Sequence, residues 1–428
     1  MDRRSFLTAA ALSAVLPLRG LVQTRHTEVT IRGDAFYING RPTYPGRTFN
    51  GKRVEGLLMN SRMVQGIFDD LNPETAARWV YPDTKRWDPD RNTTEFVAAM
   101  PEWKRHGVLA FTINLQGGSP GGGGRGRGAG PGAAAPGTTA AAGAVPAQPP
   151  TPTGPPSPQQ AGAPAPAGGG QGTRGGRGPA GPQLENSAID PDGNLRPAHM
   201  ARLARILDRA DELGMVAIVG YFYFGQDQRL KDEDAVRRAV QNATNWILDR
   251  GYRNVLVEVN NECNIGYDHE ILRPARVPEL IKFIQSQRRN GRRLLVSTSF
   301  GGTTSSPDGR EHPDTPLTAG VVRQSDYMLI HGNGPNDTAL LKRCIAASRS
   351  LNGERVVPVM INEDPNFSFT QPTNHLLASV DEYVSWGYYE QGQGNYQDGF
   401  QSPPVNWGIS SENKRQFFEL VKKVTGAS

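Results

Sequence analysis

The sequence predicts a closed (β/α)8 barrel, because short apolar segments alternate with amphipathic helical segments along most of its 428 residues. Eight apolar segments are typical of strands from Val54 onward, and helices or long connections separate them. No Gly-rich phosphate loop follows any of these segments, which disfavours the alternative of an open, doubly wound sheet. A single barrel with long loops therefore fits the chain best.

The expected elements follow in chain order. The stretch TEVTIRGDAFYINGRPTYPGR predicts a hairpin that turns at Asn39-Gly40. Strands are expected at 54–59 or 63–68, and then at 108–115, 215–224, 255–260, 294–299, 327–331, 356–362 and 384–389. Helices are expected at 94–106, with Pro101 inside, and at 197–213, 232–250, 277–289, 337–350 and 412–424.

The N-terminus, MDRRSFLTAAALSAVLPLRG, carries Arg3 and Arg4 before an apolar run that is too short to span a bilayer comfortably. This pattern resembles a twin-arginine export signal. We expect residues 1–27 to direct export to the periplasm or the extracellular space, with no stable membrane insertion after signal removal. An ordinary secretory signal and an uncleaved membrane anchor are the alternatives.

A second segment, 117–183, consists almost entirely of Gly, Pro, Ala, Ser, Thr and Gln, without acidic or aromatic residues. This composition predicts a disordered insertion in a single catalytic domain of residues 28–116 and 184–428. The insertion follows the second strand, and we expect it to be a flexible tether or a polymer-associating arm that does not shape the active-site cleft. Its few arginines (Arg125, Arg127, Arg174, Arg177) are too sparse for a Gly-Arg RNA-binding segment.

Charge and cysteine content narrow the classes of partner. The formal net charge of +5 is carried by the insertion and the N-terminal segment, so the barrel itself is close to neutral and nucleic acid is not expected as a partner. Two cysteines, Cys263 and Cys344, exclude a disulfide framework and a Cys-rich metal site, and leave either free thiols or one bridge.

Polar residues follow several of the expected strands. In a barrel of this kind, reactive groups lie at the carboxyl ends of the strands. The fourth strand ends in VEVNNECN, with Asn261 and Glu262, and the seventh ends in VMINEDPN, with Glu363. Two carboxyl groups facing one cavity are what glycoside hydrolysis requires, one to donate a proton and one to attack or to activate water. Amides and aromatic rings nearby suit the hydroxyls and C–H faces of a sugar.

These two motifs resemble those of clan A glycoside hydrolases, and in particular the cellulase-like family 5, from about Tyr37 to the C-terminus without the insertion. The resemblance implies a retaining glycosidase in which Glu262 is the acid/base and Glu363 is the nucleophile. It also implies that the substrate is an oligo- or polysaccharide and that the enzyme uses no cofactor or metal. The candidate substrate-binding residues are Asn261, His331, Asn333, Trp386, Tyr223 and Arg62.

Within that resemblance each candidate has an expected place. Asn261 would bond the sugar 2-hydroxyl, Trp386 would stack on the sugar, and Arg62 would reach the nucleophile from the first strand. Tyr221 and Tyr223 lie two positions apart, so we expect them to face the same way. The charge of Glu363 is expected to raise the pKa of Glu262 so that it holds a proton near neutral pH.

The sequence departs from the family pattern at three places, and two other functions stay open. Cys263 replaces the usual Pro, Asn333 replaces the Tyr that bonds the nucleophile, and tyrosines end the third strand where His is common. The first alternative is a barrel that binds carbohydrate without cleaving it. The second is a metal-dependent barrel hydrolase or isomerase, which the scattered histidines disfavour.

Overall fold

The computed structural model describes residues 24–118, 120, 183–301, 317–333, 337–366, 368–392 and 396–428. The chain divides into a unit of Met1–Gly123 with Leu184–Ser428 and a second unit of Gly124–Gln183. Most of the predicted export signal and nearly all of the predicted insertion lie outside the described residues, so both stay predictions. Within the described part of the chain, no helix is long and apolar enough to cross a membrane.

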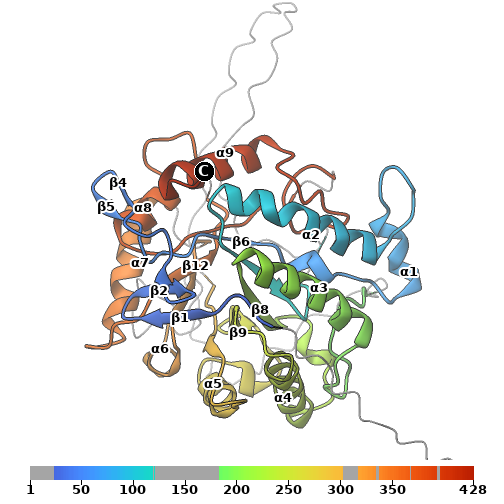
Figure 1. Ribbon diagram of the computed structural model, residues 1–428. Coiled ribbons are helices and arrows are strands. Elements are labelled where there is room, and N and C mark those ends of the chain that lie inside the picture. The colour runs from blue at the N-terminus through green and yellow to red at the C-terminus, as the bar shows by residue number, and fades with distance from the viewer. Residues whose placement is uncertain are drawn as a thin grey trace, which may run out of the picture. The chain divides into compact units, whose positions relative to one another are not determined.

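Eight strands form the barrel of the first unit, and each is followed by one or more helices (Figure 1). The strands are β6 (Asn60–Arg62), β7 (Ala110–Asn114), β8 (Val216–Tyr223), β9 (Val255–Asn261), β10 (Leu295–Ser297), β11 (Met328–His331), β12 (Val359–Glu363) and β13 (Gly387–Tyr388). Six of them pair in the order β10-β9-β8-β7-β6-β13, and β11 pairs with β12.

Backbone hydrogen bonds close the circle at its two remaining gaps. The N–H of Asp326, just before β11, donates to the carbonyl of Val296 in β10 over 2.9 Å. The N–H of Ile361 in β12 donates to the carbonyl of Ser385, just before β13, over 2.8 Å. The predicted (β/α)8 barrel is therefore confirmed.

The helices begin and end at residues suited to those positions. In α2 (Pro89–Arg105), the side chain of Asp88 accepts from the backbone N–H groups of the first turn, so the helix begins earlier than the predicted 94 and continues through Pro101. Helix α3 (Pro197–Leu213) has the predicted bounds and ends before Gly214, whose φ is +71°. The others are α1 (Pro73–Ala76), α4 (Glu233–Asp249), α5 (Val277–Ser286), α6 (Ala319–Gln324), α7 (Thr338–Ser350), α8 (His375–Asp381) and α9 (Glu412–Thr425).

The first barrel strand differs from both predicted positions. It is β6, which lies between 54–59 and 63–68 and is made of three polar residues that are all buried. The apolar residues on either side of it, such as Leu57 and Met63, belong to the hydrophobic core instead. Hydrophobicity alone therefore misplaces a strand whose side chains face a polar barrel interior.

A small sheet precedes the barrel. It comprises β1 (Val29–Arg32), β2 (Ala35–Ile38) and β3 (Arg41–Pro42), and the predicted turn at Asn39-Gly40 joins the second and third of these strands. A two-stranded ribbon, β4 (Thr48–Phe49) with β5 (Lys52–Arg53), follows. Val29 and Phe36 pack in one cluster with Ala110 and Val216, at the starts of β7 and β8. The small sheet therefore covers the end of the barrel where the strands begin.

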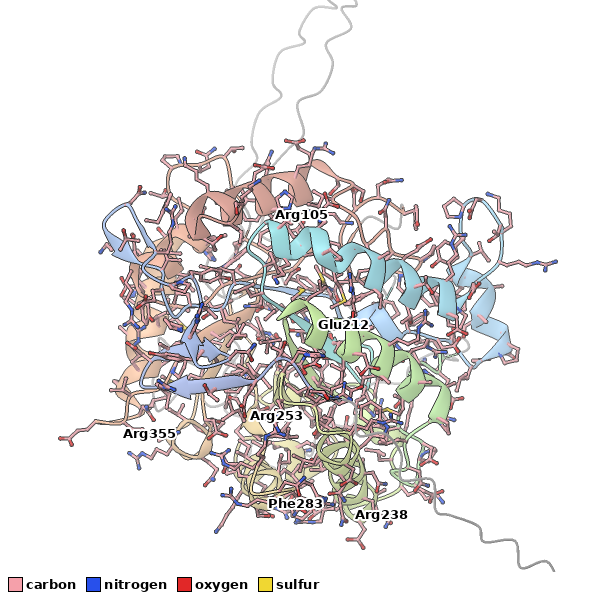
Figure 2. All side chains as sticks on the ribbon, in the orientation of Figure 1. Arg105, Glu212, Arg238, Arg253, Phe283 and Arg355 are labelled. Atoms are coloured by element: carbon pink, nitrogen blue, oxygen red, sulfur yellow. The ribbon has the colours of Figure 1, made fainter. Side chains whose placement is uncertain are left out.

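Side chains fill the space between the strands and the surrounding helices (Figure 2). A large apolar cluster occupies this layer, whereas charged side chains such as Arg238 and Arg355 extend outward from the periphery (Figure 2). Cys263 and Cys344 are both buried, and the one disulfide that the sequence allows does not join them.

Candidate active site

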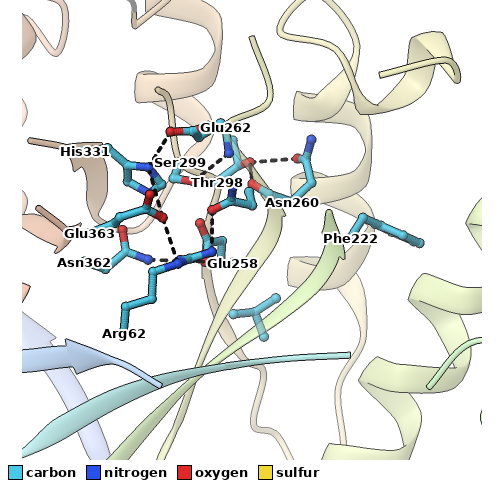
Figure 3. A network of polar contacts seen from close by, with 12 residues as sticks. Arg62, Phe222, Glu258, Asn260, Glu262, Thr298, Ser299, His331, Asn362 and Glu363 are labelled. Atoms are coloured by element: carbon cyan, nitrogen blue, oxygen red, sulfur yellow. Dashed lines mark hydrogen bonds and ion pairs between the residues drawn. The ribbon is translucent and has the colours of Figure 1, made fainter. Parts of the chain in front are cut away.

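Charged and amide side chains meet where β6, β9, β11 and β12 end, on the face of the barrel opposite the small sheet (Figure 3). The group comprises Arg62, Glu258, Glu262, His331, Asn362 and Glu363. The structure thus brings together the two predicted carboxyl groups with Arg62 and His331. Glu258 and Asn362 also belong to this group, although they are not among the candidate site residues predicted from the sequence.

Glu262 directly follows β9 and has a left-handed backbone conformation, with φ +50°. Its N–H donates to the hydroxyl of Ser299 over 2.8 Å, which fixes the turn. Gly301 lies so close that a Cβ there would be 2.7 Å from the carboxyl carbon of Glu262. A non-glycine residue held in this conformation is a common feature of functional sites, because the surrounding structure must offset its strain.

An irregularity in the pairing of β11 with β12 sets the direction of Glu363. Ile330 pairs with Ile361, but His331 pairs with Glu363, so Asn362 is an extra residue on β12. A bulge of this kind re-aims side chains. As a result, Asn362 reaches Glu258 and the next residue, Glu363, reaches Arg62, although strict alternation would turn them to opposite faces.

Arg62 binds the Glu363 carboxylate directly. Its Nε lies 2.7 Å from Oε2 of Glu363, and Arg62 is 2% exposed. A second guanidinium nitrogen, Nη2, donates to Oδ1 of Asn261 over 2.7 Å. The amide NH2 group of Asn261 is therefore the part of that side chain left to donate to a ligand.

Glu262 is held by two donors, one from the last residue of β11 and one from just after that strand. Nδ1 of His331 and Nδ2 of Asn333 lie 2.9 Å and 3.0 Å from Oε1 of Glu262. The same Nδ2 of Asn333 also donates to Oε1 of Glu363 over 3.2 Å, so one amide bridges the two carboxyl groups. Glu262, His331 and Glu363 each offer one atom that could bind a metal ion, a carboxylate oxygen or a ring nitrogen. These three atoms lie within 4.8 Å of one another.

The charges of this group shift its pKa values. Burial alone would raise the pKa of Glu262, but the hydrogen bond and charge of His331, with Arg62 and Asn333, lower it below its ordinary value. Burial raises the pKa of Glu363, with Glu262 and Glu258 adding to the rise and Arg62 and His331 opposing it. The carboxylates of Glu363 and Glu262 overcome burial and raise the pKa of His331. The expectation that the pKa of Glu262 is raised is thus wrong for the free site, because His331 is hydrogen-bonded to Glu262.

Trp386 lies apart from this group. Its side chain is fully buried, its indole N–H donates to Asp364 over 2.9 Å, and its ring packs against Phe369 and Phe417. A ring without exposed surface cannot stack on a sugar, so the structure corrects the expectation for Trp386. Its position in the core agrees with the usual environment of a large aromatic side chain.

A small pocket opens beside Arg62. Its lining residues are Arg62, Val64, Gln65, Gly117, Gly118, Tyr223, Tyr389, Gln391 and Gln401. Tyr223 lines it as a candidate binding residue should, whereas the hydroxyl of Tyr221 lies 3.2 Å from that of Thr244 in α4. The expectation that both tyrosines face the same way is therefore wrong, because side-chain alternation is not maintained at the end of β8.

Tyr389 and the three glutamines were not selected from the sequence. Tyr389 directly follows β13, so the aromatic residue contributed by the eighth strand is Tyr389 rather than Trp386. Because reactive and binding residues follow barrel strands, the position of Tyr389 directly after β13 could have indicated it from the sequence. Gln65, Gln391 and Gln401 lie in connections, where neither spacing nor hydrophobicity marks them.

A metal ion could in principle be held by Glu262, His331 and Glu363, the set of ligand-type side chains that the described residues bring together. The guanidinium of Arg62 already occupies Oε2 of Glu363 at 2.7 Å. This cation, already bound to one of the three ligand-type side chains, makes the group a poor site for a metal ion.

No protein-family model and no curated protein matches the sequence. Solved structures that the chain resembles include a glycoside hydrolase family 5 protein from Bacteroides vulgatus (11% identity, TM-score 0.48, covering 92% of this chain and 70% of that one). They also include an endo-1,4-beta-mannanase from Rhizomucor miehei (10% identity, TM-score 0.48, covering 94% and 100%).

The chain spans only 60% of the length of another Bacteroides vulgatus glycoside hydrolase, at 11% identity and a TM-score of 0.46. At such identities and TM-scores, the assignment of the barrel rests on the strand pairing described above.

Proposed function

We propose that the protein is a retaining glycoside hydrolase in which Glu363 is the nucleophile and Glu262 is the acid/base. The observation that carries the proposal is the spacing of the two carboxyl groups, which have oxygens within 4.8 Å of each other. Retaining glycosidases hold their carboxyl groups about 5 to 5.5 Å apart, whereas inverting enzymes need about 6.5 to 9.5 Å to admit a water.

The reaction has two balanced steps. In the first, a Glu363 oxygen attacks the anomeric carbon, the glycosidic C–O bond breaks, and the leaving oxygen takes a proton from Glu262. In the second, water attacks the anomeric carbon, Glu262 accepts the proton of that water, and the ester bond to Glu363 breaks. Arg62 stabilises Glu363 as an ion before the first step and after the second.

The proton for the first step is stored on His331. The charges of Glu363 and Glu262 raise the pKa of His331, and its hydrogen bond to Glu262 lowers the pKa of that carboxyl group. Transfer along the 2.9 Å hydrogen bond from Nδ1 makes Glu262 the neutral acid that the first step needs. In the second step the proton taken from water returns to His331 by the same bond.

The sugar is bound by neutral groups. Asn261 donates its amide hydrogens, since its oxygen is taken by Arg62, and the aromatic residues Tyr223 and Tyr389 line the pocket. Gln65, Gln391 and Gln401 supply further amides. Amides with aromatic rings suit the hydroxyls and C–H faces of an oligo- or polysaccharide.

Two further proposals concern the remainder of the chain. Residues 1–27 act as a twin-arginine-type export signal, so that the enzyme acts in the periplasm or outside the cell. Residues 28–116 and 184–428 form one catalytic domain, and 117–183 serve as a tether.

A metal-dependent hydrolase is the second candidate, because Glu262, His331 and Glu363 converge. A barrel that only binds carbohydrate is the third candidate. Incubation of the enzyme with EDTA separates the second from our proposal, which expects unchanged hydrolysis after chelation. Loss of activity with EDTA and its recovery on adding a divalent cation would favour the metal.

The decisive experiment measures hydrolysis of a panel of aryl glycosides by wild type, Glu262→Ala and Glu363→Ala, with and without azide. The proposal expects Glu363→Ala to be inactive on every substrate that wild type cleaves. It expects azide to rescue Glu262→Ala and to give a glycosyl azide of retained configuration. An active wild type that neither substitution affects would overturn the two-carboxylate mechanism.

A further inference from the structure

A third carboxyl group, Glu258, lies beneath the two proposed catalytic ones. It belongs to β9, is fully buried, and accepts one hydrogen bond, from Nδ2 of Asn362 to its Oε2 over 3.2 Å. Among the described residues, its other oxygen, Oε1, has no hydrogen-bond partner. A buried, half-satisfied carboxyl group costs stability, so its presence calls for a reason.

Glu258 faces the side of Arg62 that Glu363 does not occupy. Nη1 of Arg62 lies 3.9 Å from Oε2 of Glu258, too far for a hydrogen bond but close enough for strong attraction in a buried site. That Nη1 also lacks a hydrogen-bond partner among the described residues. The guanidinium therefore lies between two carboxyl groups, bonded to Glu363 and within a short shift of Glu258.

We propose that Glu258 is the counter-charge of Arg62 in the glycosyl-enzyme, when Glu363 is an uncharged ester. This inference rests on the proposed function. Formation of the ester removes the negative charge that Arg62 pairs with in the free enzyme. A buried arginine without a counter-charge is strongly destabilising, and closing the 3.9 Å gap to Glu258 restores the pair.

The two chemical steps should respond differently to the loss of Glu258. Without its charge, Arg62 attracts Glu363 more strongly and is left unpaired in the intermediate, so formation of the ester becomes slower. Breakdown of the ester regenerates the Glu363 carboxylate beside an unpaired Arg62, so this step is not slowed. Glu258 is thus a positioning residue that acts through Arg62.

The test uses Glu258→Gln, which keeps the size of the side chain and removes its charge. The probes are 2,4-dinitrophenyl 2-deoxy-2-fluoroglycosides of several sugars, which label the nucleophile of retaining glycosidases and allow both steps to be timed. We expect labelling to slow by about tenfold or more, while reactivation of the labelled enzyme keeps its rate or becomes faster. Equal slowing of both steps, or of neither, would overturn the inference.

The matched control is Asp211→Asn, which neutralises a buried carboxylate that binds the backbone N–H groups of His26 and Thr27. This variant is expected to keep both rates. If wild type is not labelled at Glu363 by any probe, the proposed function fails. A labelled wild type with unaltered kinetics in Glu258→Gln contradicts only the role of Glu258.

A second measurement needs no variant. In a crystal structure of the labelled wild type, we expect the distance from Nη1 of Arg62 to Oε2 of Glu258 to shorten from 3.9 Å to roughly 3.2 Å or less, within hydrogen-bonding range. An unchanged or longer distance would contradict the proposed exchange of partners.

Discussion

Nε of Arg62 lies 2.7 Å from Oε2 of Glu363, and both side chains are almost entirely buried. A hydrogen bond between opposite charges in such a site holds the carboxylate in one orientation and opposes the rise in the pKa of Glu363 that burial causes. This pair sets the direction from which Glu363 can react.

Replacing Arg62 by Met should lower kcat/KM by on the order of 100-fold or more, because a preorganised charge at the reacting carboxylate is lost. Steady-state kinetics on a small aryl glycoside measures the effect. The control is Arg293→Met. It removes an ion pair with Asp326 that has the same 2.7 Å length but a more exposed arginine and lies away from the proposed catalytic carboxyl groups. If both variants lose the same activity, a general packing defect accounts for the effect of Arg62.

Asn333 bridges the two carboxyl groups, so its replacement should act on kcat. In Asn333→Asp a third carboxylate would stand where an amide donates to two others, and like charges at this distance repel. We expect kcat to fall by on the order of 100-fold with a smaller change in KM. A change confined to KM would instead assign Asn333 to sugar binding, as the sequence had predicted.

His331 should make the stability of the protein depend on pH. Its folded pKa is raised above 6.5, so its contribution is fully present below pH 6.5 and is lost as pH rises through the folded pKa. Between about pH 6 and pH 9, the free energy of unfolding of wild type relative to that of His331→Gln, measured in urea, should therefore decline. Parallel pH profiles for the two proteins would contradict the shift.

Lys414 should make the free energy of unfolding rise with pH from about pH 7 upward. Burial lowers its pKa to about 7, while its Nζ donates to the carbonyl of Asn406 over 2.7 Å. Between pH 7 and 10.5 the unfolded chain holds this proton and the folded protein does not, so stability rises with pH. Thermal or urea unfolding of Lys414→Met should lose that rise, whereas Lys423→Met, an exposed lysine on the same helix, should keep it.

Deleting Gly121–Gly181 should leave hydrolysis of a small soluble glycoside unchanged. The deletion keeps Gly117 and Gly118, which line the pocket. The carbonyl of Gly118 also accepts hydrogen bonds from Asn186 and Gln226, so the pocket wall has anchors outside the deleted segment. A large loss of activity would show that the deleted residues take part in the cleft.

Residues with strong local signals were predictable from the sequence. Helix 197–213 has its predicted bounds because Pro197 and Gly214 mark its ends, and Glu262 and Glu363 were found because each ends an apolar strand. Glu258 was missed, although a carboxyl group between Val257 and Val259 in a buried strand is itself an anomaly.

Other features depend on pairing that no single segment reveals. The choice of Tyr389 over Trp386 depends on how the two-residue strand β13 pairs with its neighbours. The inward direction of both Asn362 and Glu363 depends on a register shift against β11. The position of β6 depends on a polar barrel interior that hydrophobicity cannot indicate.

The small sheet of β1, β2 and β3 affects how water and products enter and leave the site. Val29 and Phe36 fill the end of the barrel where the strands begin, so the carboxyl face is the side from which the site exchanges molecules. In a covalent mechanism, the released sugar fragment would leave, and the water would enter, through this same face of the barrel. Water could then reach the glycosyl-enzyme only after the first product has left. A fragment that leaves slowly would therefore lengthen the lifetime of the glycosyl-enzyme.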